Sequence, residues 1–399
     1  LGRGYVANVF ASEVEFPEIA NCVQMAFDSA GKLWVCCMPM YQGYRPGEPM
    51  TDKIVVLEDT DGDGKADKST LFADDLHVPT GFEVGDGGVY VAQQPDVMFL
   101  KDTDGDGKAD YRKRILHGFD SGDSHHSIST FTWGPGGGLY LHDGTFHHTS
   151  VETPWGPVRN AHGAIYRFDP TRKQLETFVS YNFANPWGHC FDEWGQNFVA
   201  DASGGANYWG TAFSSRAVPY EGQEDFGPFK FTTRAQLKQF IKKRVRPTSG
   251  IEVVSSHHFP QNVQGNLLLN NCIGFLGVLQ HKVYDDGSGF RGEEVEPILQ
   301  SADGNFRPVD FEFGPDGALY IVDWHNALVG HMQHNVRDPN RDKTHGRIWR
   351  VTYPARPLAT PPRIAGESIV NLLEVLKDPI IRTRHHARME LRLHPKKEV

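Results

Sequence analysis

The stretch FTWGPGGGLYLHDG, residues 131–144, contains a pattern that recurs along the chain. An apolar segment leads into a Gly-containing turn, and a second apolar segment centred on an aromatic residue or Leu follows. Five further stretches repeat it: QMAFDSAGKLWVCC (24–37), FEVGDGGVYVAQQ (82–94), HCFDEWGQNFVAD (189–201), FPQNVQGNLLLNN (259–271) and FEFGPDGALYIVDW (311–324). Short apolar segments separated by Gly turns are typical of antiparallel hairpins. Their regular recurrence indicates a set of equal structural units.

A second pair of apolar segments follows several of these hairpins, as in KIVVLED (53–59) and STLFADD (69–75). Four antiparallel strands per unit is the composition of a propeller blade. The sequence therefore predicts an all-β fold, a six-bladed β-propeller over residues 1–353. GYVANVFAS at 4–12 is expected to supply the missing outer strand of the last unit and so to close the ring.

The character of the chain changes after residue 353. Residues 354–365 are Pro-rich and predict a linker, whereas residues 366–399 carry apolar residues at helical spacing on both sides of Pro379. This pattern predicts a short C-terminal helical extension, a helix pair. Because an isolated pair buries little apolar surface, it either docks on the propeller or begins an array of HEAT-type repeats.

Composition excludes several classes of function. The net charge is −10 and basic residues form no run, which argues against nucleic-acid binding and favours neutral molecules or cations as partners. No segment is long and apolar enough to predict a membrane span. The five cysteines lack the spacing of zinc or haem sites, so we expect them to be buried as small hydrophobic residues.

The nonapeptide DTDGDGKAD occurs twice, at 59–67 and 102–110. It matches the start of an EF-hand calcium loop, in which positions 1, 3, 5 and 9 offer carboxylates and position 7 a backbone carbonyl. The expected calcium ligands are Asp59, Asp61, Asp63, Lys65 and Asp67 in the first copy, and Asp102, Asp104, Asp106, Lys108 and Asp110 in the second.

Position 12 of the calcium loop, normally Glu, is Thr70 in the first copy and Lys113 in the second. Without that bidentate ligand we expect weak binding, with a Kd on the order of 10⁻⁴ to 10⁻³ M, as in extracellular modules. The alternative is a solvated acidic hairpin, in which the carboxylates repel one another without a cation. Such hairpins are expected on the rim opposite the catalytic face, so this calcium is predicted to be structural.

Counting back from the centre of each repeated hairpin gives a polar residue in all six units: Asn21, His77, Ser127, Asn185, Ser255 and Arg307. Residues at this position are expected to ring the central channel, where propellers form pockets. Many of the other histidines and arginines are expected on the same face: His125, His126, His147, His148, His162, His257, His258, His325, His331, His334, Arg337, Arg341 and His345. Imidazoles gathered in a pocket suit proton abstraction or metal binding.

Three long stretches resemble a known family: DSHHSISTFTWGPGGGLYLHDG (123–144), NPWGHCFDEWGQNFVAD (185–201) and NFRPVDFEFGPDGALYIVDWHN (305–326), the last followed by RDPNRDKTHGRIWRV (337–351). They resemble the membrane-bound dehydrogenase domain of large secreted proteins in planctomycetes and related bacteria, which HEAT-type repeats and a c-type cytochrome commonly follow. More distantly, the chain is similar to soluble six-bladed sugar dehydrogenases that use pyrroloquinoline quinone (PQQ) with calcium.

The resemblance implies a periplasmic or extracellular sugar or alcohol dehydrogenase that passes electrons to a cytochrome. It implies that His126 is the base acting on the sugar hydroxyl and that Asn185 polarises the quinone. Ala184 stands where those enzymes have an Arg, so Arg307 or Arg341 would have to supply that charge. The other residues expected at the cofactor are His125, His258, Arg337 and His345.

Two other functions remain open from the residues alone. A metal-dependent glycan lyase or hydrolase would bind a transition metal through three or more of the pocket histidines, chosen from His125, His126, His257, His258 and His345. A non-catalytic propeller would hold a glycan or a protein segment in the same pocket.

Overall fold

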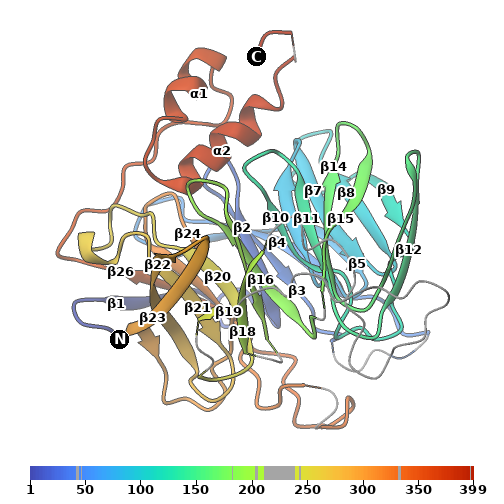
Figure 1. Ribbon diagram of the computed structural model, residues 1–399, viewed down its shortest axis with the longest axis horizontal. Coiled ribbons are helices and arrows are strands. Elements are labelled where there is room, and N and C mark those ends of the chain that lie inside the picture. Colours follow the sequence, from blue (N-terminus) through green and yellow to red (C-terminus); the bar gives the residue numbers. More distant parts are fainter. Residues whose placement is uncertain are drawn as a thin grey trace.

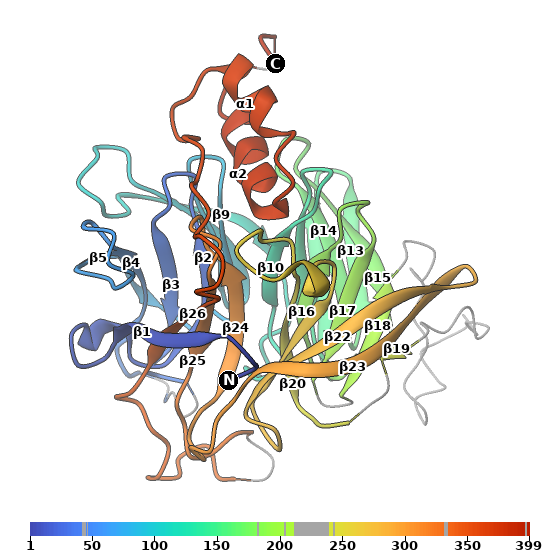
Figure 2. The same cartoon turned by 90° about the vertical axis from the view of Figure 1, so that its left-hand side faces the viewer.

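The computed structural model describes residues 1–399 except 42–44, 46, 182, 203–204, 211–238, 242–243, 331–333 and 396. Antiparallel sheets are arranged around a common axis, and a helix pair lies on one face (Figures 1 and 2). The innermost strands β2, β6, β10, β16, β20 and β24 contact one another in a closed cycle. The chain is therefore an all-β propeller with a short helical extension, as predicted.

Two four-stranded sheets and one decorated sheet come from the first half of the chain. The first contains β2 (Cys22–Phe27), β3 (Leu33–Cys37), β4 (Asp52–Glu58) and β5 (Lys68–Leu76). The second contains β6 (Phe82–Gly85), β7 (Gly88–Gln93), β8 (Asp96–Lys101) and β9 (Tyr111–His117). The third contains β10 (Ser129–Trp133), β11 (Leu139–Asp143), β14 (Ala164–Asp169) and β15 (Gln174–Ser180), with the hairpin β12 (His148–Thr153) and β13 (Gly156–Ala161) inserted.

An eight-stranded sheet follows. Its members are β16 (Pro186–Phe191), β17 (Asn197–Asp201), β18 (Ala206–Gly210), β19 (Gln239–Ile241), β20 (Thr248–Val253), β21 (Leu267–Asn271), β22 (Gly277–Asp286) and β23 (Gly289–Gln300). Its two halves meet where Ile241 of β19 pairs in parallel with Gly292 of β23. Gly292 permits this approach, because a Cβ there would lie 2.5 Å from the Ile241 side chain. The expected six separate sheets are therefore not observed.

The last sheet closes the ring with the amino terminus, as predicted. It contains β24 (Pro308–Phe313), β25 (Leu319–Asp323), β26 (Arg347–Thr352) and β1 (Val6–Ser12), with β1 antiparallel to β26. The rings of Phe10 and Phe27 pack edge-on against Tyr320 at 5.0 and 4.9 Å, so this sheet and the first share one core. Within the described part of the chain, all five cysteines are buried and unpaired.

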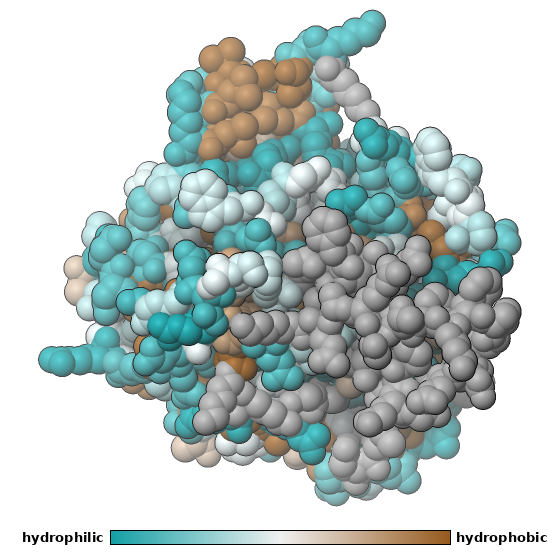
Figure 3. All heavy atoms as spheres, in the orientation of Figure 1, coloured by the Kyte–Doolittle hydropathy of each residue, from teal (hydrophilic) through white to brown (hydrophobic). Residues whose placement is uncertain are grey.

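The helix pair docks on the propeller. It consists of α1 (Ile369–Val375), capped by the Ser368 hydroxyl, and α2 (Ile381–Leu391). α2 lies across the turns that join the first and second strands of several sheets, and Glu390, for example, accepts a hydrogen bond from Ser29 Oγ at 2.9 Å. The exposed apolar side chains Val370 and Leu373 belong to α1, where Figure 3 shows an apolar patch.

Two short 3₁₀ helices complete the described secondary structure, η1 (Pro17–Ile19) and η3 (Gln261–Val263). Among the described helices, none is both long and apolar enough to cross a membrane.

Candidate functional site

A repeated irregularity at the start of the innermost strands shapes the pocket. In five of the six, the pairing with the second strand shifts register near the first residues: in β2, β10, β16, β20 and β24. Such a bulge re-aims side chains that would otherwise alternate between the two faces of a sheet. Val23, Thr130, Trp187, Ser249 and Val309 lie at these shifts, and all of them line one pocket on the axis.

The pocket is a cavity of about 150 Å³ with aromatic walls. Tyr41, Trp187 and Trp324 lie around His125, whose ring is 4.9 Å from that of Trp187 at 80°. The Tyr41 hydroxyl and His125 Nδ1 are hydrogen-bonded at 2.5 Å, and the two rings are nearly parallel. Aromatic faces combined with a few fixed polar groups are the usual lining of a small-molecule site.

Asp310 is the acidic group of this pocket. Its Oδ2 accepts a hydrogen bond from the Met25 backbone amide at 3.0 Å, and its side chain lines the pocket beside Gln24 and Thr130. Burial raises the pKa of Asp310 to about 7, although the amides of Met25 and Phe311 act in the opposite direction. A carboxyl that titrates near neutrality can accept or donate a proton at physiological pH.

The structure places the two adjacent histidines differently with respect to the pocket. His126 was predicted to be the base, but it is only 5 % exposed and does not line the pocket, whereas His125 does. His126 Nδ1 lies 3.1 Å from the Ala184 carbonyl oxygen, and its ring packs edge-on against Phe146 at 5.5 Å. The two histidines lie in a turn, in which the His126 amide donates to the Asp123 carbonyl oxygen at 3.0 Å, and of the two only His125 lines the pocket.

Asn185 and Arg307 lie where the sequence predicts, directly before the innermost strands β16 and β24. The Arg307 guanidinium, however, is not available to a ligand. It donates to the carbonyl oxygens of Asn326 (2.7 Å), Cys272 (2.9 Å) and Ala327 (3.2 Å). Arg307 is therefore a buried clamp between two loops, and the prediction that it polarises a quinone is not supported by its contacts.

The other cationic residues expected at a cofactor either contact groups of the protein itself or are exposed at its surface. Arg341 donates to the carbonyl oxygens of Asn335 (3.0 Å) and Gly330 (2.7 Å), and Arg337 is exposed. His345 Nδ1 lies 2.5 Å from Asp342 Oδ2, with its Nε2 3.9 Å from Glu13. Among the described residues that line the pocket, none is Lys or Arg. His331 lies outside the described residues.

His257 and His258 lie on the opposite face, contrary to expectation. The connection between β20 and β21 contains η3 and is longer than its counterparts, so counting back from Leu268 reaches this connection instead of the loop before β20. His258 Nδ1 is 2.9 Å from the Pro357 carbonyl oxygen, and His258 Nε2 accepts from the Tyr353 amide at 2.8 Å. Ser255 accepts from Ile381 at the start of α2. His258 therefore anchors the linker.

Because His257 and His258 lie on the opposite face from His125, the predicted transition-metal site does not form from these histidines. Among the described residues, the groups of three or more side chains that could hold an ion are Asp59, Asp61 and Asp67 in one place, and Asp102, Asp104 and Asp106 in another. The histidines proposed for a lyase or hydrolase do not assemble into such a group.

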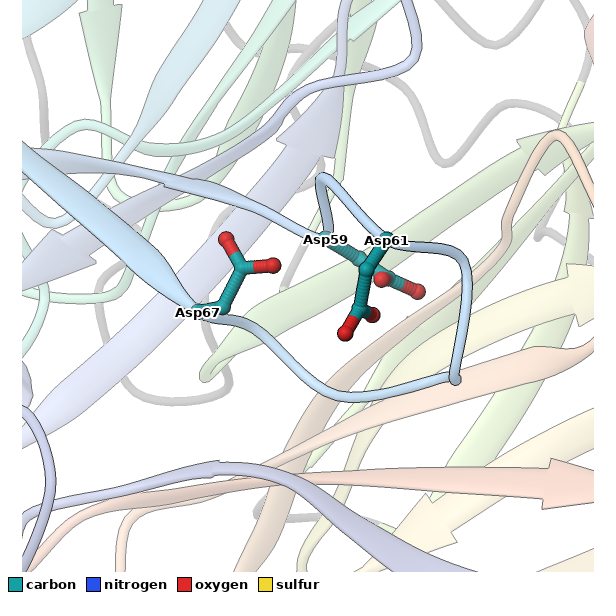
Figure 4. Close-up of side chains that lie close together, drawn as sticks. All are labelled: Asp59, Asp61 and Asp67. Carbon is teal, nitrogen blue, oxygen red and sulfur yellow. The ribbon is translucent and has the colours of Figure 1, made fainter.

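The two acidic hairpins have the same internal hydrogen bonds. Asp59 accepts from the amides of Gly62 (2.8 Å) and Gly64 (2.9 Å), as Asp102 does from Gly105 (2.7 Å) and Gly107 (2.8 Å). These amides, Gly105 first, lower the pKa of Asp102. Figure 4 shows Asp59 and Asp61 together, with Asp67 across the loop.

The remaining predicted ligands of these hairpins follow the same scheme. Asp63 and Asp106 each accept from the amide two residues on, that of Lys65 or Lys108, at 2.8 Å. Asp110 accepts from the Thr103 amide at 2.7 Å. The donor sets are all oxygen, which suits calcium, a hard cation.

Each acidic hairpin also fastens its sheet to the preceding one. The Ala66 amide donates to the Phe10 carbonyl oxygen of β1, and the Ala109 amide donates to that of Phe72 in β5, both at 2.8 Å. Asp102 and Asp106 line a groove together with His385 of α2, so the second hairpin lies on the helix side, opposite the axial pocket. This hairpin therefore lies on the side opposite the pocket, where the sequence predicts it.

The aromatic walls of the pocket were not predicted from the sequence. Tyr41, Trp187 and Trp324 come from three different units, and only Trp187 had a local signal, the Asn185-Pro186 dipeptide before it. Proline at the first residue of a strand commonly accompanies a bulge or an edge.

A family model described as a domain of unknown function, DUF7133, matches residues 1–355. The chain belongs to the DUF7133 family. No curated protein matches this DUF7133 chain. Solved structures do, at low identity.

A luciferin-regenerating enzyme aligns at 12% identity with a TM-score of 0.55, covering 90% of this chain and 98% of that one. The apo soluble aldose sugar dehydrogenase of Escherichia coli aligns at 13% and 0.51, covering 88% and 99%. The PQQ domain of pyranose dehydrogenase from Coprinopsis cinerea aligns at 13% and 0.52, covering 88% and 96%. At these identities the likeness shows a shared propeller fold, that of sugar dehydrogenases among others.

Proposed function

We propose that the DUF7133 propeller binds a sugar or similar polyhydroxy compound in its axial pocket and oxidises one of its hydroxyl groups, as a dehydrogenase does. The observation that carries the proposal is the pocket lining, in which three aromatic rings share one cavity with His125 and the carboxyl group of Asp310. Aromatic faces stack on the apolar faces of a sugar ring, while hydroxyl, amide and carboxyl groups fix its orientation. Sugar dehydrogenases with the same fold support this substrate class.

The pocket residues have separate tasks in this proposal. His125, held by the Tyr41 hydroxyl, and Asp310, held by the Met25 amide, are the two groups that can take a hydroxyl proton from the substrate. Trp187 and Trp324 form the walls and exclude water from the bound molecule.

PQQ is the cofactor that the family resemblance implies, and the described lining does not fit it well. PQQ carries several carboxylates, which need cationic partners. Arg307 and Arg341 direct their guanidinium groups to backbone carbonyls, and the described lining adds an acidic group, Asp310. The described lining therefore lacks the cationic partners that the carboxylates of PQQ need.

A non-catalytic sugar-binding propeller is the second candidate. The specific observation in its favour is that Arg307 donates to three carbonyl oxygens and that no arginine is among the described residues that line the pocket, so none of these residues offers a guanidinium to an oxyanion.

The wider setting belongs to the same proposal. We propose that the eight-stranded sheet serves as two blades, giving six units around the pocket, and that the acidic hairpins hold structural calcium. Weak calcium sites suit a periplasmic or extracellular location. A c-type cytochrome would be the electron acceptor if the protein oxidises its ligand.

Titration calorimetry with a panel of sugars tests binding, and dye-linked oxidation with and without PQQ and calcium tests turnover. The substitution His125→Gln should weaken sugar binding at least tenfold, whereas the buried His126→Gln should change affinity little. The control is His148→Gln, at an exposed histidine of the inserted hairpin β12–β13.

The possible results separate the candidates. Binding without turnover under every condition favours the binding module, and turnover that requires PQQ favours the quinoprotein. If no sugar binds, or if His126→Gln impairs binding more than His125→Gln, the assignment of this pocket is wrong.

A further inference from the structure

The helix side of the axial channel contains an arginine from the C-terminal extension. Arg382 of α2 donates through Nε to Glu252 Oε2 at 3.1 Å and forms a closer contact to the same oxygen through Nη2. Its Nη1 lies 3.4 Å from Glu312 Oε1. Arg382 thus joins the innermost strands β20 and β24 from a segment that is not part of the propeller.

Four acidic side chains face this arginine on the axis. Glu83, Glu252 and Glu312 are 7%, 3% and 4% exposed, and Asp310 lies next to them on β24. A second cavity of about 40 Å³ is lined by Glu83, Asp310, Glu312 and Arg382 among others. Among the described residues that line this cavity, Arg382 is the one cation, and its positive charge offsets the negative charges of the acidic side chains. Without that cation, closely spaced buried carboxyl groups strongly raise one another's pKa.

The second cavity is continuous in its lining with the axial pocket. Gln24, Thr130, Trp187 and Asp310 line both. Burial raises the pKa of Glu312 to about 7 and that of Glu83 well above its ordinary value, and in each case Arg382 acts to lower it. For Asp310, the charge of Arg382 likewise opposes the effects of burial and of Glu252.

The groups that face Asp310 come from several elements. Glu312 lies on its own strand, Glu252 on β20, Glu83 on β6 and Arg382 on α2. His189 of β16 also lines the second cavity, and burial lowers its pKa well below its ordinary value, so it is neutral near pH 7. Arg382 is therefore the cation among these groups.

We propose that Arg382 is a positioning residue for the axial pocket: inserted from α2 among the axial acids, it keeps Asp310 ionised for ligand binding. The part that concerns ligand binding rests on the proposed function of the pocket. In this proposal the propeller and its C-terminal helices form one functional unit, because α2 supplies a charged side chain on the helix side of the axial pocket.

The test compares Arg382→Gln with Arg392→Gln. Arg392 also joins α2 to the propeller, through Asp86 at 2.8 Å, and both arginine side chains are 22% exposed. Urea unfolding of each variant is followed from pH 5 to pH 9, with and without Asp310→Asn, so that the contribution of Asp310 to the pH dependence is isolated. Sugar affinity is measured over the same range.

Loss of the charge should raise the titration midpoint of Asp310 by about one pH unit in Arg382→Gln, and Arg382→Lys should restore most of it. At pH 7 the ionised fraction would then fall from about one half to about one tenth, so that affinity falls roughly fivefold. Arg392→Gln should lower stability equally at all pH values and leave the midpoint in place.

An unchanged midpoint in Arg382→Gln, or the same shift in Arg392→Gln, would overturn the proposal. If Arg382→Gln does not fold, Glu252→Gln carries the test, since removing this neighbouring carboxylate should lower the midpoint, and no movement would again overturn it. A midpoint that moves while no sugar binds to any variant refutes the proposed function of the pocket and leaves the role of Arg382 standing.

Discussion

The substitution Arg307→Met should destabilise the fold much more than it changes any chemistry. The methionine side chain occupies a similar volume but leaves the buried carbonyl oxygens of Asn326 and Cys272, and the partly buried one of Ala327, without their donor. An unsatisfied buried polar group costs about 1–3 kcal/mol, so the free energy of unfolding should fall by roughly 3–5 kcal/mol once partial access of water is allowed for. The backbone bond from the Arg307 amide to Asp323 is retained.

Urea denaturation followed by Trp fluorescence measures this loss, with Arg337→Met as the control because Arg337 is exposed on the same face. The control should change stability by less than about 0.5 kcal/mol. The reasoning fails if Arg307→Met unfolds at the same urea concentration as wild type but no longer binds or oxidises a sugar. That result would mean that the guanidinium turns to the ligand in solution.

Three further results are expected. A calcium chelator should lower the melting temperature in calorimetry, and the double substitution Asp61→Asn with Asp104→Asn should abolish its effect; an identical melting curve with and without chelator would show that no ion stabilises the hairpins. Burial raises the pKa of Asp310 and Glu312 to about 7 in the folded protein, whereas their pKa is near 4 in the unfolded chain. The folded state therefore binds more protons between these values, so the free energy of unfolding should fall as pH rises from about 4 to 7 and then level off. Urea midpoints that rise over this range would contradict this expectation. Gly118→Ala should destabilise by several kcal/mol in the same assay, because φ is 113° and a Cβ would lie 2.2 Å from the Ser150 carbonyl oxygen; wild-type stability would show that the local backbone yields easily.

Local patterns were sufficient for the propeller and for the acidic hairpins. Gly turns between apolar segments depend on the chain within about ten residues, and the hairpins around Trp34 and Tyr320 form as their own sequence dictates. The acidic loops likewise close through their own backbone amides. The pairing of β1 with β26 followed from the strand that the last unit lacked.

The pocket was harder to predict because it depends on directions that a sequence does not state. Counting residues assumes equal connections, and the longer connection after β20 moved Ser255 and His258 to the other face. The choice between His125 and His126 depended on the conformation of the turn before β10, which the two adjacent histidines do not reveal. The role of Arg307 depended on carbonyl groups contributed by loops far away in the sequence.

Ring closure also has a consequence for how the protein is made. β1 is synthesised well before its partner β26, which lies about 335 residues further along the chain. Until β26 emerges, β1 has no sheet to join, and the first acidic hairpin can bind Phe10 only in an unpaired strand. Contacts this distant in sequence form slowly, and an unpaired strand is prone to pair with other chains. We therefore expect a late, slow step during biosynthesis in which β1 pairs with a strand made long after it, and a nascent chain that depends on chaperones until then.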